Sequence, residues 1–381
     1  MTSASPASPS PASPSPAAVA DLVAAAAAAP SGDLLALTAA LVAVPSESLD
    51  EDAVAGAVEA RLRRVPGLDV ERVGRNVVAR TNLGRDRRIV LAGHLDTVPA
   101  NGNAVPRMER DVLHGLGAAD MKSGIAVLLR LAEEVAAGSR FDCTFVFYEA
   151  EEIADEHNGL RKLFADRPDL VAGDFAVLLE PTDLWLEAGC QGSIRLEATF
   201  VGQRAHTARP WQGVNAVYRA APVLERLAGY TPEEIEVDGL RFRQALQVVS
   251  VSGGVAGNVV PDRCTVVVNR RYAPALSLEE AEAEVRALLD GADEITLTSV
   301  SPAAHPNLGH PLVAEFAGLL DLPVRCKLGW TDVARFSAHG VPAVNFGPGD
   351  PEVSHTAGEH VTRASVEGCF TALAAFLLGR A

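Results

Sequence analysis

Three carboxylates follow one strongly apolar segment of this 381-residue sequence. The run FDCTFVFY ends at Tyr148, and Glu149, Glu151 and Glu152 come directly after it. Like charges this close repel each other, and the apolar residues before them predict a strand that enters a buried core. The pattern indicates either a cation bound between the carboxylates or a carboxylate that takes part in chemistry.

Other residues that can bind metals or move protons also follow apolar runs, and they are His94, Asp96, Asp120, Glu180 and His355. His94 and Asp96 are two positions apart, so on a strand they face the same way. In an open α/β sheet, ligands bind beyond the carboxyl ends of the strands. A set of nitrogen and oxygen donors without a thiolate suits zinc or a neighbouring divalent metal.

Each of these residues also has a purely structural interpretation. A histidine at a strand end is often only hydrogen-bonded, and Asp120 precedes a helical pattern that it could cap. Glu151, Glu152 and Glu180 could be ordinary loop carboxylates. The recurrence of such residues at successive strand ends favours the metal site over separate roles.

Apolar strands alternate with helical patterns before residue 187 and again after residue 298. Strands are predicted at 89–95, 143–152 and 174–182, and an amphipathic helix at 125–138. Alternation of this kind predicts the α/β class, with a mostly parallel sheet flanked by helices.

The middle of the chain has a different pattern. Residues 193–207, 245–254 and 264–273 alternate in the manner of half-exposed strands, and 277–291 reads as an amphipathic helix. We therefore predict an α+β lid domain at 187–298, inserted into a catalytic domain formed by 18–186 and 299–381.

The first 17 residues are a Ser/Pro/Ala repeat without charge, for which we predict a disordered tail. The apolar stretch that follows carries Asp21 and lacks a basic segment before it. This pattern favours a solvated tail or a misassigned start codon over a signal peptide.

Composition excludes several classes of function. The formal net charge of −16 opposes binding to nucleic acid, whose phosphates would be repelled. No apolar run reaches the roughly 18 residues that a membrane span needs. The five cysteines are scattered and contain no CxxC pair, as expected of reduced thiols in a cytoplasmic protein.

Five segments together resemble the motifs of the di-zinc amidohydrolase and exopeptidase family, which includes aminoacylase-1 and glutamate carboxypeptidase. They are GHLDTVP, GLGAADMKSGIA, EAEEI, EPT and GPGDPEVSHTAGEHV. The resemblance covers essentially the whole chain after the tail. Ala150 and Leu179 depart from it, because the family often has Asp and Gly there, but neither is a predicted ligand.

The resemblance implies two divalent metal ions per subunit, zinc or alternatively cobalt. Asp120 would bridge them, and the other ligands would be His94 and Glu180 for one metal, Glu152 and His355 for the other. The family also implies a cis peptide bond after Asp120.

Two further roles follow from the same resemblance. Asp96 would hydrogen-bond the far nitrogen of His94 and fix its tautomer. Glu151 would remain uncoordinated, take a proton from a water that the metals acidify, and pass it to the departing amine.

Substrate contacts are also implied by the family motifs. NVVPDRCTVVVNRRY resembles a segment that contributes Asn258 and Arg271, and Arg271 would hold a substrate carboxylate. Arg270 points the other way, and we expect it on a solvated face. Thr331 and Gly347 match further positions that face the substrate.

GQRAHTARP resembles the family segment whose histidine, here His206, enters the active site of a partner subunit. The resemblance therefore implies a homodimer formed through the lid. In it His206 would donate a hydrogen bond to the oxyanion that forms on the substrate.

The segment from Gly329 to Val361 most resembles succinyl-diaminopimelate desuccinylases of high-GC Gram-positive bacteria. The expected reaction is hydrolysis of N-succinyl-LL-2,6-diaminopimelate, a small N-acyl diamino acid. The alternatives are acetylornithine deacetylase or another N-acyl-amino-acid hydrolase, and, in a different class, a metal-binding scaffold without activity.

Overall fold

The computed structural model describes residues 15–30, 32–320 and 323–379. The chain divides into two compact units, of which the first contains Met1–Glu187, His310–Val324 and Val341–Ala381. The second contains Ala188–Gly309 and Arg325–Gly340. Of the predicted tail, residues 1–14 lie outside the described part. Ser15 caps helix α1 (Pro16–Ala28), so the last two residues assigned to the tail are helical.

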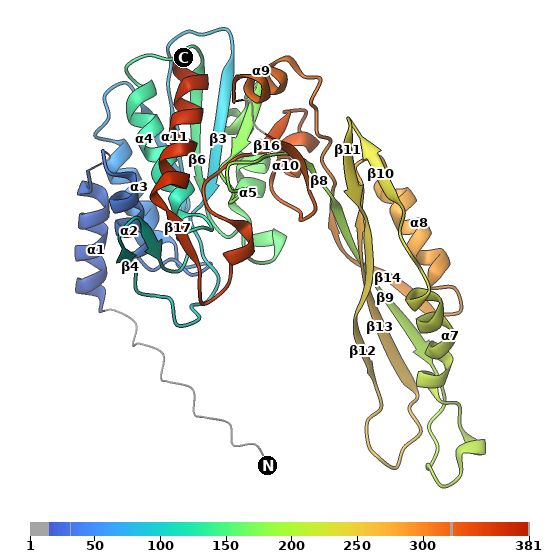
Figure 1. The fold of residues 1–381 in the computed structure, drawn as a ribbon. Helices are drawn as coiled ribbons and strands as arrows, with labels where there is room; N and C mark the ends of the chain where they lie inside the picture. Colours follow the sequence, from blue (N-terminus) through green and yellow to red (C-terminus); the bar gives the residue numbers. More distant parts are fainter. Residues whose placement is uncertain (1–14, 31, 321–322, 380–381) are drawn as a thin grey trace. The chain divides into compact units, whose positions relative to one another are not determined.

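An eight-stranded sheet has the order β1-β2-β6-β3-β7-β16-β8-β15. Figure 1 labels β3, β6, β8 and β16 among the strands of this sheet. Its strands are β1 (Asp69–Val73), β2 (Asn76–Arg80), β3 (Arg88–His94), β6 (Asp142–Tyr148), β7 (Phe175–Leu178), β8 (Leu186–Cys190), β15 (Val324–Lys327) and β16 (Ala343–Asn345). The neighbours β6, β3, β7 and β16 run parallel. Every residue of β6 and β7 is buried, as in a sheet covered on both faces. The predicted fold class is confirmed.

Helices flank this sheet, and α4 packs against β3 and β6 with α2 and α11 beside it. The helices of the first unit after α1 are α2 (Leu34–Val42), α3 (Asp52–Leu62), α4 (Lys122–Val135), α5 (Gly159–Asp166), α6 (Pro168–Val171), α9 (Pro311–Leu320) and α11 (Arg363–Leu378). A Cβ on Gly124 would lie 2.5 Å from the carbonyl oxygen of Leu179. Glycine is therefore needed for α4 to approach the end of β7 so closely.

A small sheet of order β17-β5-β4 completes the first unit. It consists of β4 (Arg107–Glu109), β5 (Val112–His114) and β17 (His360–Thr362). Among the described residues, none of the helices combines the length and apolar character needed to cross a membrane.

The second unit is built on an antiparallel sheet of order β12-β13-β9-β14, against which α7 and α8 pack. Its elements are β9 (Gly192–Val201), α7 (Ala216–Ala228), the hairpin β10 (Glu234–Val237) and β11 (Leu240–Arg243), β12 (Ala245–Gly253), β13 (Arg263–Tyr272), α8 (Leu278–Leu288), β14 (Glu294–Ser301) and α10 (Val333–Ala338). The boundary that we predicted after residue 298 falls within β14. That strand stays paired with β9 as far as Ser301 and Ser193, which keeps it in the second unit.

The expectation that Arg270 lies on a solvated face is wrong. Its side chain is 1% exposed, and its guanidinium forms a 2.8 Å ion pair with Glu284 of α8. Arg270 also donates to the amide oxygen of Gln244 at 3.1 Å. Alternation along β13 correctly puts Arg270 opposite Arg271, but it does not reveal that α8 covers the Arg270 face.

Candidate metal centre

The parallel strands of the first unit end at one edge of the sheet. His94 at the end of β3 pairs with Tyr148 at the end of β6. Leu178 at the end of β7 pairs with Ala92 on one side and Asn345 of β16 on the other. The segments that follow these strands therefore leave from the same edge, and they carry the ligands predicted from the sequence.

Asp120 lies between the two predicted histidine ligands. Its Oδ1 is 3.1 Å from Nε2 of His94, and its Oδ2 is 3.5 Å from Nε2 of His355. The helix-cap alternative for Asp120 is wrong, because α4 is preceded by Met121 and has no side-chain cap. The peptide bond between Asp120 and Met121 is cis, as the family resemblance implied.

The predicted ligands form two groups that could each hold a metal ion. They are His94, Asp120 and Glu180, and Asp120, Glu152 and His355, with ligand atoms within 4.8 Å of one another in each group. Asp120 belongs to both, which fits a bridging role. The donors are imidazole nitrogens and carboxylate oxygens, which suit zinc and its neighbours.

Glu151 lies close enough to join a third such group, with His94 and Glu152. Geometry alone therefore leaves two roles open for Glu151, as a ligand or as a base beside the metals. The two roles differ in whether the metal stays when the carboxylate is replaced by an amide.

Asp96 orients both His94 and the segment that carries the paired glutamates. Nδ1 of His94 is 3.1 Å from the backbone oxygen of Asp96 and 3.4 Å from its Oδ1. Since both partners are acceptors, Nδ1 carries the proton and Nε2 is left for a metal. The Asp96 carboxylate also accepts the backbone N–H groups of Glu151 and Glu152, at 3.0 and 3.1 Å.

The cluster strongly favours positive charge. Hydrogen bonds to Asp120 and Glu152 raise the pKa of His355 to about 10. Burial disfavours the charged form of His94, yet Asp120 and Asp96 raise its pKa well above the usual value. Such carboxylate surroundings stabilise a proton on imidazole for the same reason that they would stabilise a divalent cation.

Glu149, the first of the three carboxylates, has a different environment. It is 4% exposed, and its carboxylate contacts Nζ of Lys162 at 2.9 Å and the guanidinium of Arg75 at 3.4 Å. Two cationic side chains therefore compensate its charge, and it belongs to none of the three candidate ligand groups.

Glu359 supports Asp120 and was missed by the sequence analysis. This carboxylate is 1% exposed, and its Oε1 accepts the N–H groups of Ala119 and Asp120, both at 3.0 Å. Burial raises the pKa of Glu359, while these hydrogen bonds oppose the rise. The sequence feature that could have identified Glu359 is its position four residues after the predicted ligand His355, in the segment HTAGEH.

Gly347, in the first unit, lies against the segment that carries Glu180. A Cβ at this position would be 2.4 Å from the carbonyl oxygens of both Leu179 and Glu180. The close approach requires glycine. A substrate role for Gly347 stays a prediction.

The other predicted substrate residues lie in the second unit. His206 is exposed and forms an isolated β-bridge with Val259. Asn258 lies beside it, because the carbonyl oxygen of Asn258 accepts the N–H of Thr207 at 3.1 Å. Arg271 is half-buried on β13, and Thr331 is 4% exposed.

Known proteins resemble this chain over most of its length. The family model described as Peptidase family M20/M25/M40 matches residues 90–379. A Mycobacterium tuberculosis protein provisionally named succinyl-diaminopimelate desuccinylase DapE is 46% identical, over 91% of this chain and 99% of its own. The succinyl-diaminopimelate desuccinylase of Corynebacterium glutamicum is 43% identical, over 86% of this chain and 91% of its own.

Solved structures share the fold. A Staphylococcus aureus tripeptidase superposes with a TM-score of 0.75 at 20% identity, covering 91% of this chain and 98% of its own. A Bacillus subtilis protein described as a dinuclear metal-binding peptidase from the M20 family gives a TM-score of 0.68 at 15% identity. That likeness covers 91% of this chain and 97% of the other.

Proposed function

Because the chain belongs to peptidase family M20/M25/M40, we propose that its metal centre hydrolyses N-succinyl-LL-2,6-diaminopimelate to succinate and LL-2,6-diaminopimelate. The observation that carries the proposal is the convergence of five predicted ligands and Glu151 at one sheet edge. The names of two relatives, at 46% and 43% identity over most of the chain, support the substrate.

The residues present fit two divalent metals, with zinc proposed for both and cobalt as an alternative. Asp120 would bridge them, His94 and Glu180 would complete one site, and Glu152 and His355 the other. When bound, the metals would lower the pKa of a water molecule and polarise the amide carbonyl.

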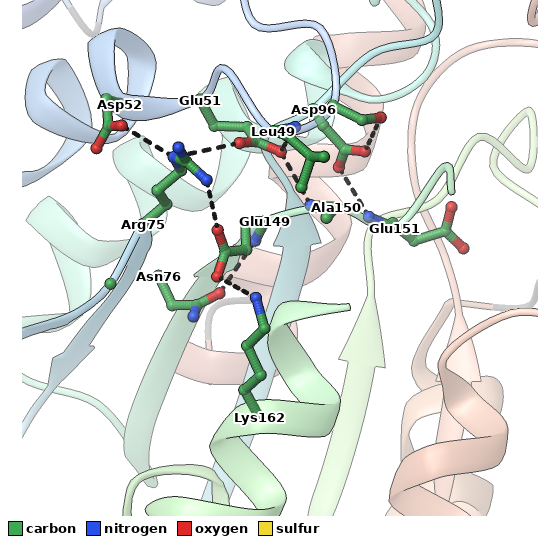
Figure 2. A network of polar contacts seen from close by, with 12 residues as sticks. Leu49, Glu51, Asp52, Arg75, Asn76, Asp96, Glu149, Ala150, Glu151 and Lys162 are labelled. Carbon is green, nitrogen blue, oxygen red and sulfur yellow. Dashed lines mark hydrogen bonds and ion pairs between the residues drawn. The ribbon is translucent and has the colours of Figure 1, made fainter. Parts of the chain in front are cut away.

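Glu151 acts as the general base in this proposal. Its backbone N–H is held by Asp96, and its side chain extends away from the neighbouring Glu51–Arg75–Glu149 contacts (Figure 2). Glu151 takes the proton of the attacking water and returns it to the nitrogen of the departing diaminopimelate. The C–N bond of the amide breaks. The water oxygen stays on the succinyl carbonyl carbon, which becomes a carboxylate of succinate.

The second unit would serve as the lid and dimerisation domain. Arg271 is proposed to bind a substrate carboxylate, with Asn258, Thr331 and Gly347 completing the contacts. The pKa of Arg271 is lowered by burial and by nearby Arg195, which leaves its positive charge intact. Two cationic groups close together favour an anionic ligand.

We also propose that the enzyme is a cytoplasmic homodimer. β12 is an edge strand of the second unit and exposes apolar side chains along it, with Val249 55% and Val251 49% exposed. An exposed apolar edge strand is a surface suited to pairing with another chain.

The substrate proposal is tested by a competition among acyl substrates. Metal-loaded protein would be assayed with succinyl-diaminopimelate, acetylornithine and a dipeptide, and kcat/KM compared. We expect succinyl-diaminopimelate to have the highest value. Preference for acetylornithine would overturn the substrate assignment, and hydrolysis of none would favour the scaffold alternative.

A further prediction is that His206 completes the active site of the partner subunit. His206→Ala is expected to lower kcat by about 10²–10³, because a hydrogen-bond donor to the developing oxyanion is lost. Mixing inactive His206→Ala and Glu151→Gln variants, with subunit exchange, should restore activity in mixed dimers. Confirmed exchange without recovered activity would show that His206 does not act across the interface.

A further inference from the structure

The segment that carries Glu151 and Glu152 is held by side chains at every backbone amide. The N–H groups of residues 149–152 donate in turn to Asn76 Oδ1 at 3.0 Å, Glu51 Oε1 at 3.1 Å, Asp96 Oδ1 at 3.0 Å and Asp96 Oδ2 at 3.1 Å. Figure 2 shows these acceptors reaching the segment from different parts of the first unit. Each of these four acceptors is a side chain, and the carbonyl oxygen of Glu149 also accepts the backbone N–H of Gly159 at 2.8 Å.

Ala150 is the turning point of this segment. Its φ of 55° lies in the left-handed region, which costs free energy for a residue with a Cβ. Ala150 is also fully buried, so its N–H has no access to water. The acceptor of that N–H, Glu51, therefore stabilises the strained residue immediately before Glu151.

Glu51 is itself held firmly. Its side chain is fully buried, and the same Oε1 accepts the N–H of Leu49 at 2.9 Å. Its Oε2 lies 3.7 Å from Nε of Arg75, whose guanidinium also reaches Glu149. Two residues earlier than Glu51 in this loop, Leu49 also has a left-handed φ, of 76°.

The loop of Glu51 also contacts Asp96. Ser48 donates its hydroxyl to Asp96 Oδ2 at 2.7 Å, and its N–H to the carbonyl oxygen of Thr97 at 3.1 Å. The loop that contains Ser48 and Glu51 is therefore hydrogen-bonded both to the segment after β3 and to the segment after β6. These are the two segments that carry Asp96 and the paired glutamates.

We propose that Glu51 is a positioning residue for amide hydrolysis, which fixes the direction of the Glu151 side chain by binding the N–H of Ala150. The inference rests on the proposed role of Glu151 as general base. Glu51 touches neither the candidate metal ligands nor the reacting atoms, and it acts only through the backbone at Ala150. Without this acceptor, Ala150 relaxes and the Glu151 carboxylate moves away from its working position.

The test compares Glu51→Ala with Glu51→Gln, each measured as kcat per metal-loaded site. A displacement of about 1 Å at a reacting group costs up to about 10²-fold in rate. Glu51→Ala should therefore lower kcat roughly 10–100-fold, with KM and metal content unchanged. Glu51→Gln keeps an oxygen that can accept both N–H groups, so it should remain within about fivefold of the wild type.

Asp52→Ala is the matched control. Asp52 is the next residue in the chain, and its side chain is 65% exposed. Its Oδ2 lies 2.9 Å from Nε of Arg75, the same guanidinium that lies beside Glu51. Asp52 makes no contact with Ala150, so its removal should leave kcat unchanged. Should Glu51→Ala fail to fold, Glu51→Asp retracts the carboxylate by one methylene and should give an intermediate loss of kcat.

A double variant separates positioning from a general loss of order. If Glu51 acts through Glu151, adding Glu51→Ala to Glu151→Gln should slow single turnover no further. The same fold-loss in both backgrounds would overturn the inference, as would an unchanged kcat in Glu51→Ala or a loss explained by missing metal.

A structure of metal-loaded Glu51→Ala separates this inference from the proposed function. The Glu151 carboxylate should be displaced in it, and an unmoved carboxylate would contradict the inference for any substrate. A wild-type enzyme that hydrolyses none of the acyl substrates would instead refute the proposed function, whatever the position of Glu151.

Discussion

Replacement of Glu151 by Gln is expected to lower kcat by about 10²–10⁴ while both metals remain bound. The amide cannot accept the proton of the attacking water or return it to the leaving nitrogen. Glutamine is nearly the same shape, and the backbone N–H of residue 151 would still donate to Asp96. The change should therefore remove the base without disturbing the segment.

The measurement is turnover of succinyl-diaminopimelate together with metal content per chain. Glu149→Gln is the matched control, because Glu149 is held by Lys162 and Arg75 and belongs to no candidate ligand group. It should keep both metals and near-normal kcat. Loss of metal from Glu151→Gln would make Glu151 a ligand, and near-normal turnover with full metal would exclude it as the base.

Replacement of Asp120 by Ala is expected to reduce turnover to the background rate and metal content to below one ion per chain. Asp120 is the residue common to the groups containing His94 and His355, so its loss weakens both sites. Without its charge, the remaining carboxylates and imidazoles lie around a gap at the centre of the cluster. Metal binding depends on the number and charge of such ligands.

Asp155→Ala provides a control of the same chemical change. Asp155 is half-exposed, forms a 3.0 Å ion pair with Arg161, and follows Glu152 by three residues. It should retain both metals and wild-type kcat. Two bound metals in Asp120→Ala, measured by elemental analysis after removal of excess metal, would contradict the bridging role.

Much of the centre followed from the sequence because parallel strands impose a common edge. His94, Glu152 and Glu180 were assigned to strand ends, and the register of β3, β6 and β7 places those ends side by side. Local apolar runs are enough to predict this, since each strand is buried on both faces. The substrate-facing roles of His206, Asn258, Arg271 and Thr331 stay predictions.

The supporting residues were beyond the reach of local patterns. Glu51 and Ala150 are separated by 99 residues, and Glu359 and Asp120 by 239. The partners of both carboxylates are backbone N–H groups, which almost any residue type provides. Only the tertiary fold reveals which backbone amides need an acceptor.

The error at Arg270 has a related cause. Alternation along β13 separates its two faces, but it does not specify which face another element covers. Glu284, which pairs with Arg270, belongs to a helix that amphipathic patterning had predicted correctly. The pairing between helix and strand is a tertiary contact, and it reverses the expected exposure of the arginine.

The metal-dependent desuccinylase activity is tested most directly by titrating metal-free protein with zinc while measuring succinate release from succinyl-diaminopimelate. Activity should be absent without metal and should reach its plateau at two zinc ions per chain. Cobalt should also restore activity, since the ligand set accepts neighbouring divalent metals. Succinate release that persists in metal-free protein, or its absence at two bound ions per chain, would contradict the proposed metal-dependent desuccinylase.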